Sequence, residues 1–175
     1  MRRLLLLRHA KAERSQPGGS DLERGLTDRG TTDARKLGAY FVRHRLMPGL
    51  AIVSTSVRTR ETWRLLAGTF DRPPKARFDE RLYDASPEAI VRIIQETAPG
   101  IETLLVIGHN PGLQEAAVRL VGAGDVDARQ RLAEQFPTAA LAVIEFAREE
   151  WSRVHVQGGR LEHFVKPRSL AAATD

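Results

Sequence analysis

The sequence contains no cysteine. This absence excludes disulfide bonds, catalysis by a thiolate and metal sites with sulfur ligands. Aromatic residues make up only 6% of the chain, and the basic residues behind its net charge of +5 are spread out rather than clustered. A nucleic-acid binder more often combines a basic cluster with interleaved aromatic side chains. We therefore expect no nucleic-acid partner.

Long hydrophobic runs are also absent. No stretch approaches the roughly 18 apolar residues that a membrane helix needs. Arg2 and Arg3 precede the apolar segment Leu4 to Leu7, but Arg8 ends it, well short of the about 7–15 residues of a signal-peptide core. A buried strand explains this segment better. We expect a cytoplasmic protein with no membrane partner.

The composition is that of an ordinary globular protein. Of the 175 residues, 42% are apolar and 28% are charged, which fits one domain with a sizeable core. We expect a single domain over residues 1–175, with a flexible tail over 167–175. The excess of basic residues fits either a solvated, arginine-rich surface or an anionic substrate, because a guanidinium pairs with phosphate through two hydrogen bonds.

Short apolar segments alternate with helical patterns over the first two-thirds of the chain. Strands are expected over 3–7, 50–53, 76–78 and 103–108, and helices after the capping residues Thr27, Ser56, Ser86 and Asn110. This alternation is typical of helices packed on both faces of a mainly parallel sheet. We predict an α/β fold, a three-layer α/β/α sandwich.

The last third of the chain has a different pattern. We expect a charged helix over 127–135, a strand over 140–146, a half-exposed strand over 151–156 and a short segment over 161–165. The final two or three strands are expected to add antiparallel edges to the sheet.

Polar side chains follow three of the expected strands. Ligands of open α/β sheets bind beyond the carboxyl ends of the strands. The first strand ends in Arg8 and His9, and the strand over 103–108 ends in His109. The second strand ends at Ser54, and Arg58 lies in the helical turn after it. Two histidines and two arginines should therefore meet at one edge of the sheet.

Such a set suits the transfer of a phosphoryl group to a histidine. A neutral imidazole is a competent nucleophile near pH 7, and its attack gives a covalent phosphohistidine that splits one displacement into two. Arginines hold the charge on the phosphoryl oxygens, and a second histidine hydrogen-bonds them in the transition state. The helix N-terminus beside Arg58 also favours phosphate. We expect no cofactor and no metal, because these groups supply the positive field.

Three ordered motifs carry a family resemblance. Arg8-His9-Ala10 follows a strand, Arg58 lies in the segment 54–62, and Gly108-His109-Asn110-Pro111 follows another strand. Together they resemble the histidine phosphatase (phosphoglycerate mutase-like) superfamily, and most closely its short SixA-type phosphohistidine phosphatases. The loop over 20–27, the lack of a cap insertion and the short chain favour that branch. The likeness runs from Leu4 to about Ser169, and Ala10 departs from the superfamily's usual glycine.

The resemblance implies roles for the residues at these motifs. His9 would be the nucleophile, and Arg8, Arg58 and His109 would bind the phosphate. For the acid that protonates the leaving group, Asp21 is the first choice and Glu80 the second, although either fits a plain surface carboxylate. Arg24 would extend the basic pocket or pair with Glu23 or Asp21, and Ser15 would face the phosphate.

The substrate and several rival functions stay open. The expected partner is a phosphorylated protein carrying phosphohistidine, or else a small phosphomonoester. His9, His109 and Asp21 are residue types that bind zinc or manganese, but they lack a compact metal-binding motif, and the nearby arginines would repel a dication. A mutase would need a covering insertion. A non-catalytic phosphate-recognition module would not need the nucleophile that His9 supplies.

Overall fold

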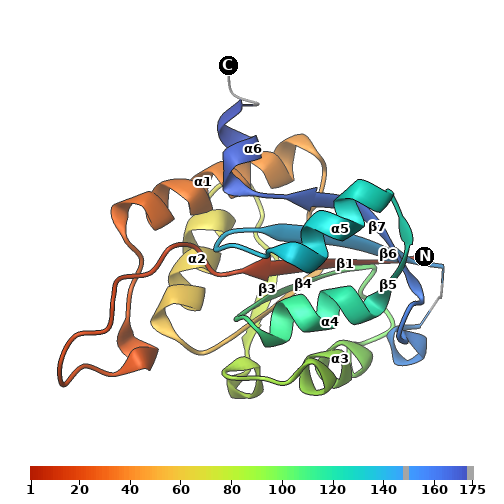
Figure 1. Cartoon of the computed structure of the whole chain (residues 1–175), viewed down its shortest axis with the longest axis horizontal. Coiled ribbons are helices and arrows are strands. Elements are labelled where there is room, and N and C mark those ends of the chain that lie inside the picture. Colours follow the sequence, from red (N-terminus) through yellow and green to blue (C-terminus); the bar gives the residue numbers. More distant parts are fainter. Residues whose placement is uncertain (148–149, 173–175) are drawn as a thin grey trace.

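The computed structural model describes residues 1–147 and 150–172, and within them seven strands form one sheet with helices on both faces (Figure 1). The strands lie in the order β3-β2-β4-β1-β6-β7-β5. Their bounds are β1 Arg2–Arg8, β2 Leu50–Val53, β3 Lys75–Phe78, β4 Thr103–Gly108, β5 Val121–Gly124, β6 Leu141–Phe146 and β7 Gly159–Val165.

The helices form two groups. α1 (Asp28–Arg43), α2 (Val57–Ala67) and the short α6 (Pro167–Ala172) share one hydrophobic core, and α3 (Pro87–Gln95), α4 (Gly112–Leu120) and α5 (Val126–Glu134) share another. Three short 3-10 helices complete the described chain: η1 Asp21–Glu23, η2 Glu80–Leu82 and η3 Trp151–Arg153.

The central strand β1 explains why the sheet is covered on both sides. Side chains alternate across a strand, so Leu4 and Leu6 enter the core under α3 and α4, whereas Leu5 and Leu7 enter the core under α1 and α2. All four leucines are completely buried. A continuous apolar run is the pattern expected of a strand that lies between two helical layers, and this confirms the α/β/α sandwich.

The sheet is mainly parallel, as predicted. β1, β2, β3 and β4 run parallel to one another, and β6 is antiparallel to both β1 and β7. β6 does not lie at the edge, however, because β7 and β5 extend the sheet beyond it. β5 pairs with β7 in parallel.

Three local predictions differ from the structure. The half-exposed strand expected over 151–156 is wrong: Trp151–Arg153 is a 3-10 helix, and Trp151 is buried and donates from Nε1 to the Ile101 carbonyl. The strand β5, which begins at Val121, lies in a segment where no strand was predicted. The segment predicted as a flexible tail contains α6 over Pro167–Ala172, with Leu170 buried in the core that it shares with α1 and α2.

The carboxyl ends of β1, β2, β3 and β4 lie at one edge of the sheet, since these strands are parallel. The long connection from β1 to α1 projects from this edge, and it carries η1 (Figure 1). The connection from β3 to α3, which carries η2, leaves the sheet at the same edge.

Candidate active site

His9 directly follows β1 and is only 7% exposed. Its backbone N–H donates to the Gly108 carbonyl at 3.2 Å, which ties it to the end of β4. Its ring Nδ1 lies 2.8 Å from the Ala10 carbonyl oxygen. A carbonyl only accepts, so Nδ1 must carry the proton in this contact. The lone pair of the neutral ring is then on Nε2, the atom available for attack on a phosphoryl group.

The surroundings of His9 keep its ring neutral. Burial is the main cause that lowers the pKa of His9 to about 3; the bond to Ala10 raises this pKa, and the nearby His109, Arg58 and Arg8 lower it. At neutral pH the imidazole is therefore a free base, the form that acts as a nucleophile.

His109 follows β4 and faces His9, with the two ring centroids 5.3 Å apart. Its Nδ1 lies 3.4 Å from Nη2 of Arg58, a group that only donates, and its Nε2 lies 2.8 Å from the Ser54 hydroxyl. Ser54 directly follows β2. Burial, followed by the charge of Arg58, lowers the pKa of His109 to about 4.

Arg58 is held in the first turn of α2, and its side chain is buried. The helix begins with Ser56, whose side chain accepts from the Thr59 N–H. The Thr59 hydroxyl in turn donates to the Ser54 carbonyl at 2.6 Å, so the helix start is fixed to the end of β2. This anchoring explains why a short apolar strand followed by a serine cap delivers a guanidinium to the sheet edge.

Arg8, the last residue of β1, brings a second guanidinium to the site. Its Nη1 donates to the Phe136 carbonyl at 3.1 Å. Burial and the charge of Arg58 lower the pKa of Arg8, which indicates that the two guanidiniums lie near each other. The Nε atoms of Arg8 and Arg58 are buried and have no hydrogen-bond partner among the described residues. Two buried, unpaired donors beside two imidazoles form a site that an oxyanion would complete.

Asp21 reaches the site from η1, in the projecting loop. Its carbonyl accepts from Nη1 of Arg58 at 2.7 Å, and its carboxylate contacts Nη2 of Arg58 at 3.1 Å and Nε of Arg24 at 2.9 Å. The Tyr83 hydroxyl donates to the same carboxylate. This bond to Tyr83, together with those to Arg24 and Arg58, lowers the pKa of Asp21 to about 2. Asp21 is thus an ionised, ion-paired group at neutral pH.

Tyr83 is the site residue that sequence reasoning missed. It follows η2, and its ring stands edge-on to His109 with centroids 5.4 Å apart. The guanidinium carbon of Arg58 lies 5.9 Å from the centre of the same ring. The sequence contained a signal for Tyr83. The segment 79–84 follows the carboxyl end of β3 and therefore lies at the same edge of the sheet as His9 and His109.

The remaining candidates are placed less centrally. Arg24 joins the site through Asp21, and its Nη1 also donates to the Glu13 carbonyl at 2.7 Å. Ser15 is exposed and makes no hydrogen bond within the described chain. Glu80 is likewise exposed and has no ion-pair partner within residues 1–147 and 150–172.

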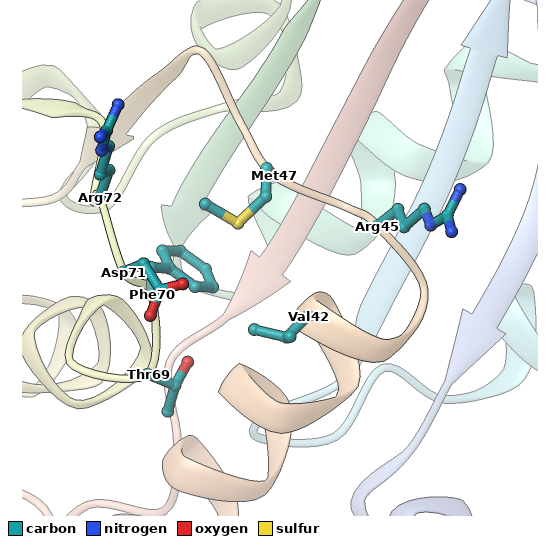
Figure 2. A pocket seen from close by; sticks show the side chains of 7 residues that line it. All are labelled: Val42, Arg45, Met47, Thr69, Phe70, Asp71 and Arg72. Carbon is teal, nitrogen blue, oxygen red and sulfur yellow. The ribbon is translucent and has the colours of Figure 1, made fainter.

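A second cavity, of about 440 Å³, lies away from this site, beyond the C-terminal end of α1 (Figure 2). Apolar groups from Val42, Met47 and Phe70 line it, and Arg45 and Arg72 stand at its sides. Arg45 precedes β2 and Arg72 precedes β3, so this cavity is at the amino ends of the parallel strands. None of the candidate site residues lines it.

Two features are absent from the described residues. Among them, no three His, Asp or Glu side chains gather in a way that would hold a metal ion. No helix in the same part of the chain has the length and apolar character needed to cross a membrane.

Comparisons with known proteins agree with the fold. The family model of the histidine phosphatase superfamily (branch 1) matches residues 4–90. Uncharacterized proteins of Mycobacterium leprae and Mycobacterium tuberculosis are 32% and 34% identical to this chain, and each alignment covers 93% of this chain and 100% of the relative.

Two solved structures are similar over nearly the whole chain. A protein of Agrobacterium tumefaciens assigned as the phosphohistidine phosphatase SixA has a TM-score of 0.81 at 28% identity, over 95% of this chain and 98% of that one. A second protein assigned as SixA, from Nakamurella multipartitia, has a TM-score of 0.83 at 25% identity, over 95% and 96% of the two chains.

The fold, with imidazoles and guanidiniums gathered at one edge of its sheet, is typical of enzymes that act on phosphoryl groups. The chain belongs to the histidine phosphatase superfamily, and its structure is SixA-like. The resemblance drawn from the three motifs is thereby confirmed, and the protein is an enzyme of the phosphatase and mutase type.

Proposed function

We propose that this protein is a metal-independent phosphatase that removes phosphate from phosphohistidine on proteins, through a covalent phosphohistidine at His9. The observation that carries this proposal is the set of buried, unpaired Nε donors of Arg8 and Arg58 beside a neutral His9. Burying an unsatisfied donor is costly, and a bound phosphoryl oxygen removes that cost.

The proposed reaction has two displacements. In the first, Nε2 of His9 attacks phosphorus while the bond from phosphorus to the substrate's imidazole nitrogen breaks. The substrate ring, protonated on its other nitrogen, leaves as neutral imidazole. In the second, water attacks phosphorus, the bond to Nε2 breaks, and inorganic phosphate is released as His9 recovers its lone pair. Arg8 and Arg58 hold the phosphoryl oxygens throughout, and His109 donates to them from Nε2 in place of its bond to Ser54.

The state of Asp21 favours phosphohistidine over an ester. An alkoxide leaving group needs a proton donor, and the pKa of Asp21 lies at about 2, so it is deprotonated at neutral pH. The side chain of Glu80, the second candidate for this acid, makes no hydrogen bond or ion pair to the site residues within the described structure. A substrate that brings its own ring proton does not require such a donor. Both similar structures carry the name phosphohistidine phosphatase SixA.

A comparison of substrates tests this proposal. We expect kcat/KM to be higher for a phosphohistidine peptide than for the same peptide carrying phosphoserine, by at least about a hundredfold, because removing general acid help costs about 100-fold or more on an ester. Asp21→Asn should slow both substrates by a similar factor. Faster turnover of the phosphoserine peptide, with a loss in Asp21→Asn confined to it, would identify an esterase with Asp21 as its acid.

A further inference from the structure

A further pocket, of about 260 Å³, is lined mostly by polar side chains and includes none of the candidate site residues. It lies between the start of α1, the segment before β6 and the segment after β7. Its charged and hydrogen-bonding groups come from Arg29, Asp33, Gln135, Thr138, Lys166 and Arg168.

Strand register places this pocket at the edge of the sheet where β1 ends and His9 follows. Leu7 of β1 pairs with Leu141 of β6, and Leu141 pairs with Val165 of β7. Since β6 is antiparallel to both neighbours, β7 ends at the same edge as β1, and Lys166 emerges there.

The wall of the pocket is tied to the site by hydrogen bonds. The Phe136 carbonyl accepts from Arg8, and the Ala139 N–H donates to the carbonyls of Arg8 and His9 at 3.1 and 3.0 Å. The residues between them, 137 and 138, line the pocket. The segment 136–139 therefore connects the lining of the pocket to Arg8 and to the backbone of His9.

The pocket carries more positive than negative charge. Three cations face one carboxylate, and the ion pair from Nε of Arg29 to Asp33 is long, at 3.9 Å. Lys166 lies over the ring of Phe164, with Nζ 5.8 Å from its centre, and neither Lys166 nor Arg168 has an acidic partner among the described residues. Two cationic groups beside the site are thus left for a ligand.

We propose that this pocket docks an acidic segment of the phosphorylated protein, next to its phosphohistidine. This inference rests on the proposed function, because only a protein substrate presents a surface around the phosphoryl group. A specific interface buries about 800 Å² on each partner, far more than one phosphorylated side chain covers. It would therefore extend from His9 across the segment 135–139 to Lys166 and Arg168, where opposite charge favours an acidic partner.

The experiment uses two fluorescent peptides with one phosphohistidine each, flanked by glutamates in one and by glutamines in the other. Binding is measured by fluorescence anisotropy and turnover by phosphate release. We expect the full-length protein to bind the glutamate peptide about tenfold more tightly at low ionic strength, with the difference shrinking as salt is added. The double variant Lys166→Glu/Arg168→Glu should lose this preference, and Lys166→Gln/Arg168→Gln should lose part of it.

The matched control reverses two arginines at the remote cavity of Figure 2, as Arg45→Glu/Arg72→Glu. It changes the net charge equally and should keep the preference. Equal binding of both peptides, a preference that survives Lys166→Glu/Arg168→Glu, or one lost equally in the control would overturn the docking pocket.

Free phosphohistidine separates this proposal from the proposed function. All variants should hydrolyse it at the rate of the unmodified protein, since the docking residues lie outside the site. Hydrolysis without any charge preference between peptides would sink the docking pocket alone. A glutamate preference in binding, without hydrolysis of any phosphohistidine substrate, would support docking and reject the proposed function.

Discussion

Asp21, Arg58 and Tyr83 form one contact group at the rim of the site. The Tyr83 hydroxyl and Nη2 of Arg58 both donate to the same Asp21 oxygen. The ring of Tyr83 lies beside both Arg58 and His109. Tyr83 therefore orients two groups that are proposed to hold the phosphoryl oxygens, without itself reacting.

Tyr83→Phe should keep the ring contacts and remove the bond to Asp21. The Asp21 side chain is 44% exposed, so solvent replaces part of the lost interaction. We expect kcat/KM on phosphohistidine to fall about threefold to tenfold, because a hydrogen bond to a charged group is worth about 1.5–3 kcal/mol before that screening. The pKa of Asp21, followed by NMR, should rise.

The control for this variant is Tyr40→Phe. Tyr40, the only other tyrosine, lies on α1, and its hydroxyl makes no hydrogen bond within the described residues. It should have unchanged kinetics. An Asp21 pKa that stays at about 2 in Tyr83→Phe would contradict the role given to the hydroxyl.

The two buried histidines should make the stability of the protein depend on pH. Burial lowers the pKa of His9 to about 3 and that of His109 to about 4. Between these pKa values and about 6.5, the unfolded chain binds more protons than the folded protein does. The contribution of the two histidines to the free energy of unfolding is therefore fully present above pH 6.5 and is lost as the pH falls. From pH 7 to pH 5, each histidine should remove up to about 2 kcal/mol from the free energy of unfolding.

Urea unfolding at the two pH values measures this dependence. The double variant His9→Gln/His109→Gln should lose less stability on acidification than the unmodified protein. The single variant His155→Gln, at an exposed histidine, serves as the control and should leave the pH dependence of the free energy of unfolding unchanged. An identical loss in the double variant would mean that the two imidazoles are not kept neutral by the fold.

At the level of elements, the loop from β1 to α1 is held to α2 by Glu61. Its Oε2 accepts from the Leu26 N–H at 3.1 Å, and a Cβ built on Gly25 would lie 3.0 Å from its Oε1. The bridge between Ala12 and Leu26 closes the loop, which carries Asp21 and Arg24. Glu61 thus fixes the base of the segment that brings Asp21 to Arg58.

Glu61→Ala should loosen this loop. We expect faster amide hydrogen exchange over residues 12–26 and a higher KM for phosphohistidine, with kcat changed less, because the residues at the reacting phosphorus come from strands and α2. Glu61→Gln keeps an oxygen acceptor and should restore most of the KM. A fall in kcat alone, with unchanged exchange, would contradict this role.

Over the whole molecule, local patterns predicted most of what positions the site. The four leucines of β1 and the apolar run before Gly108 identify buried strands, and in a parallel sheet their ends must meet. The sequence pattern alone therefore predicts that His9, Arg58 and His109 lie close together. Ser56 marked the helix start that fixes Arg58.

The missed features depend on contacts between distant segments. Tyr83 joins the site by meeting Asp21, which lies 62 residues earlier. Trp151 alternates with polar neighbours like a strand residue, but its indole N–H pairs with the Ile101 carbonyl and the ring is buried. β5 is a strand through its parallel pairing with β7, which lies later in the sequence. No periodicity in a single segment contains such information.

The proposed mechanism depends on one covalent intermediate at His9. Its most direct test is to mix the protein with a phosphoramidate phosphate donor, quench rapidly and locate the bound phosphate by mass spectrometry. We predict acid-labile, base-stable phosphate on His9 and its absence in His9→Ala, which should also lose turnover. Phosphate on another residue, full turnover by His9→Ala, or activity abolished by a chelator would contradict the account.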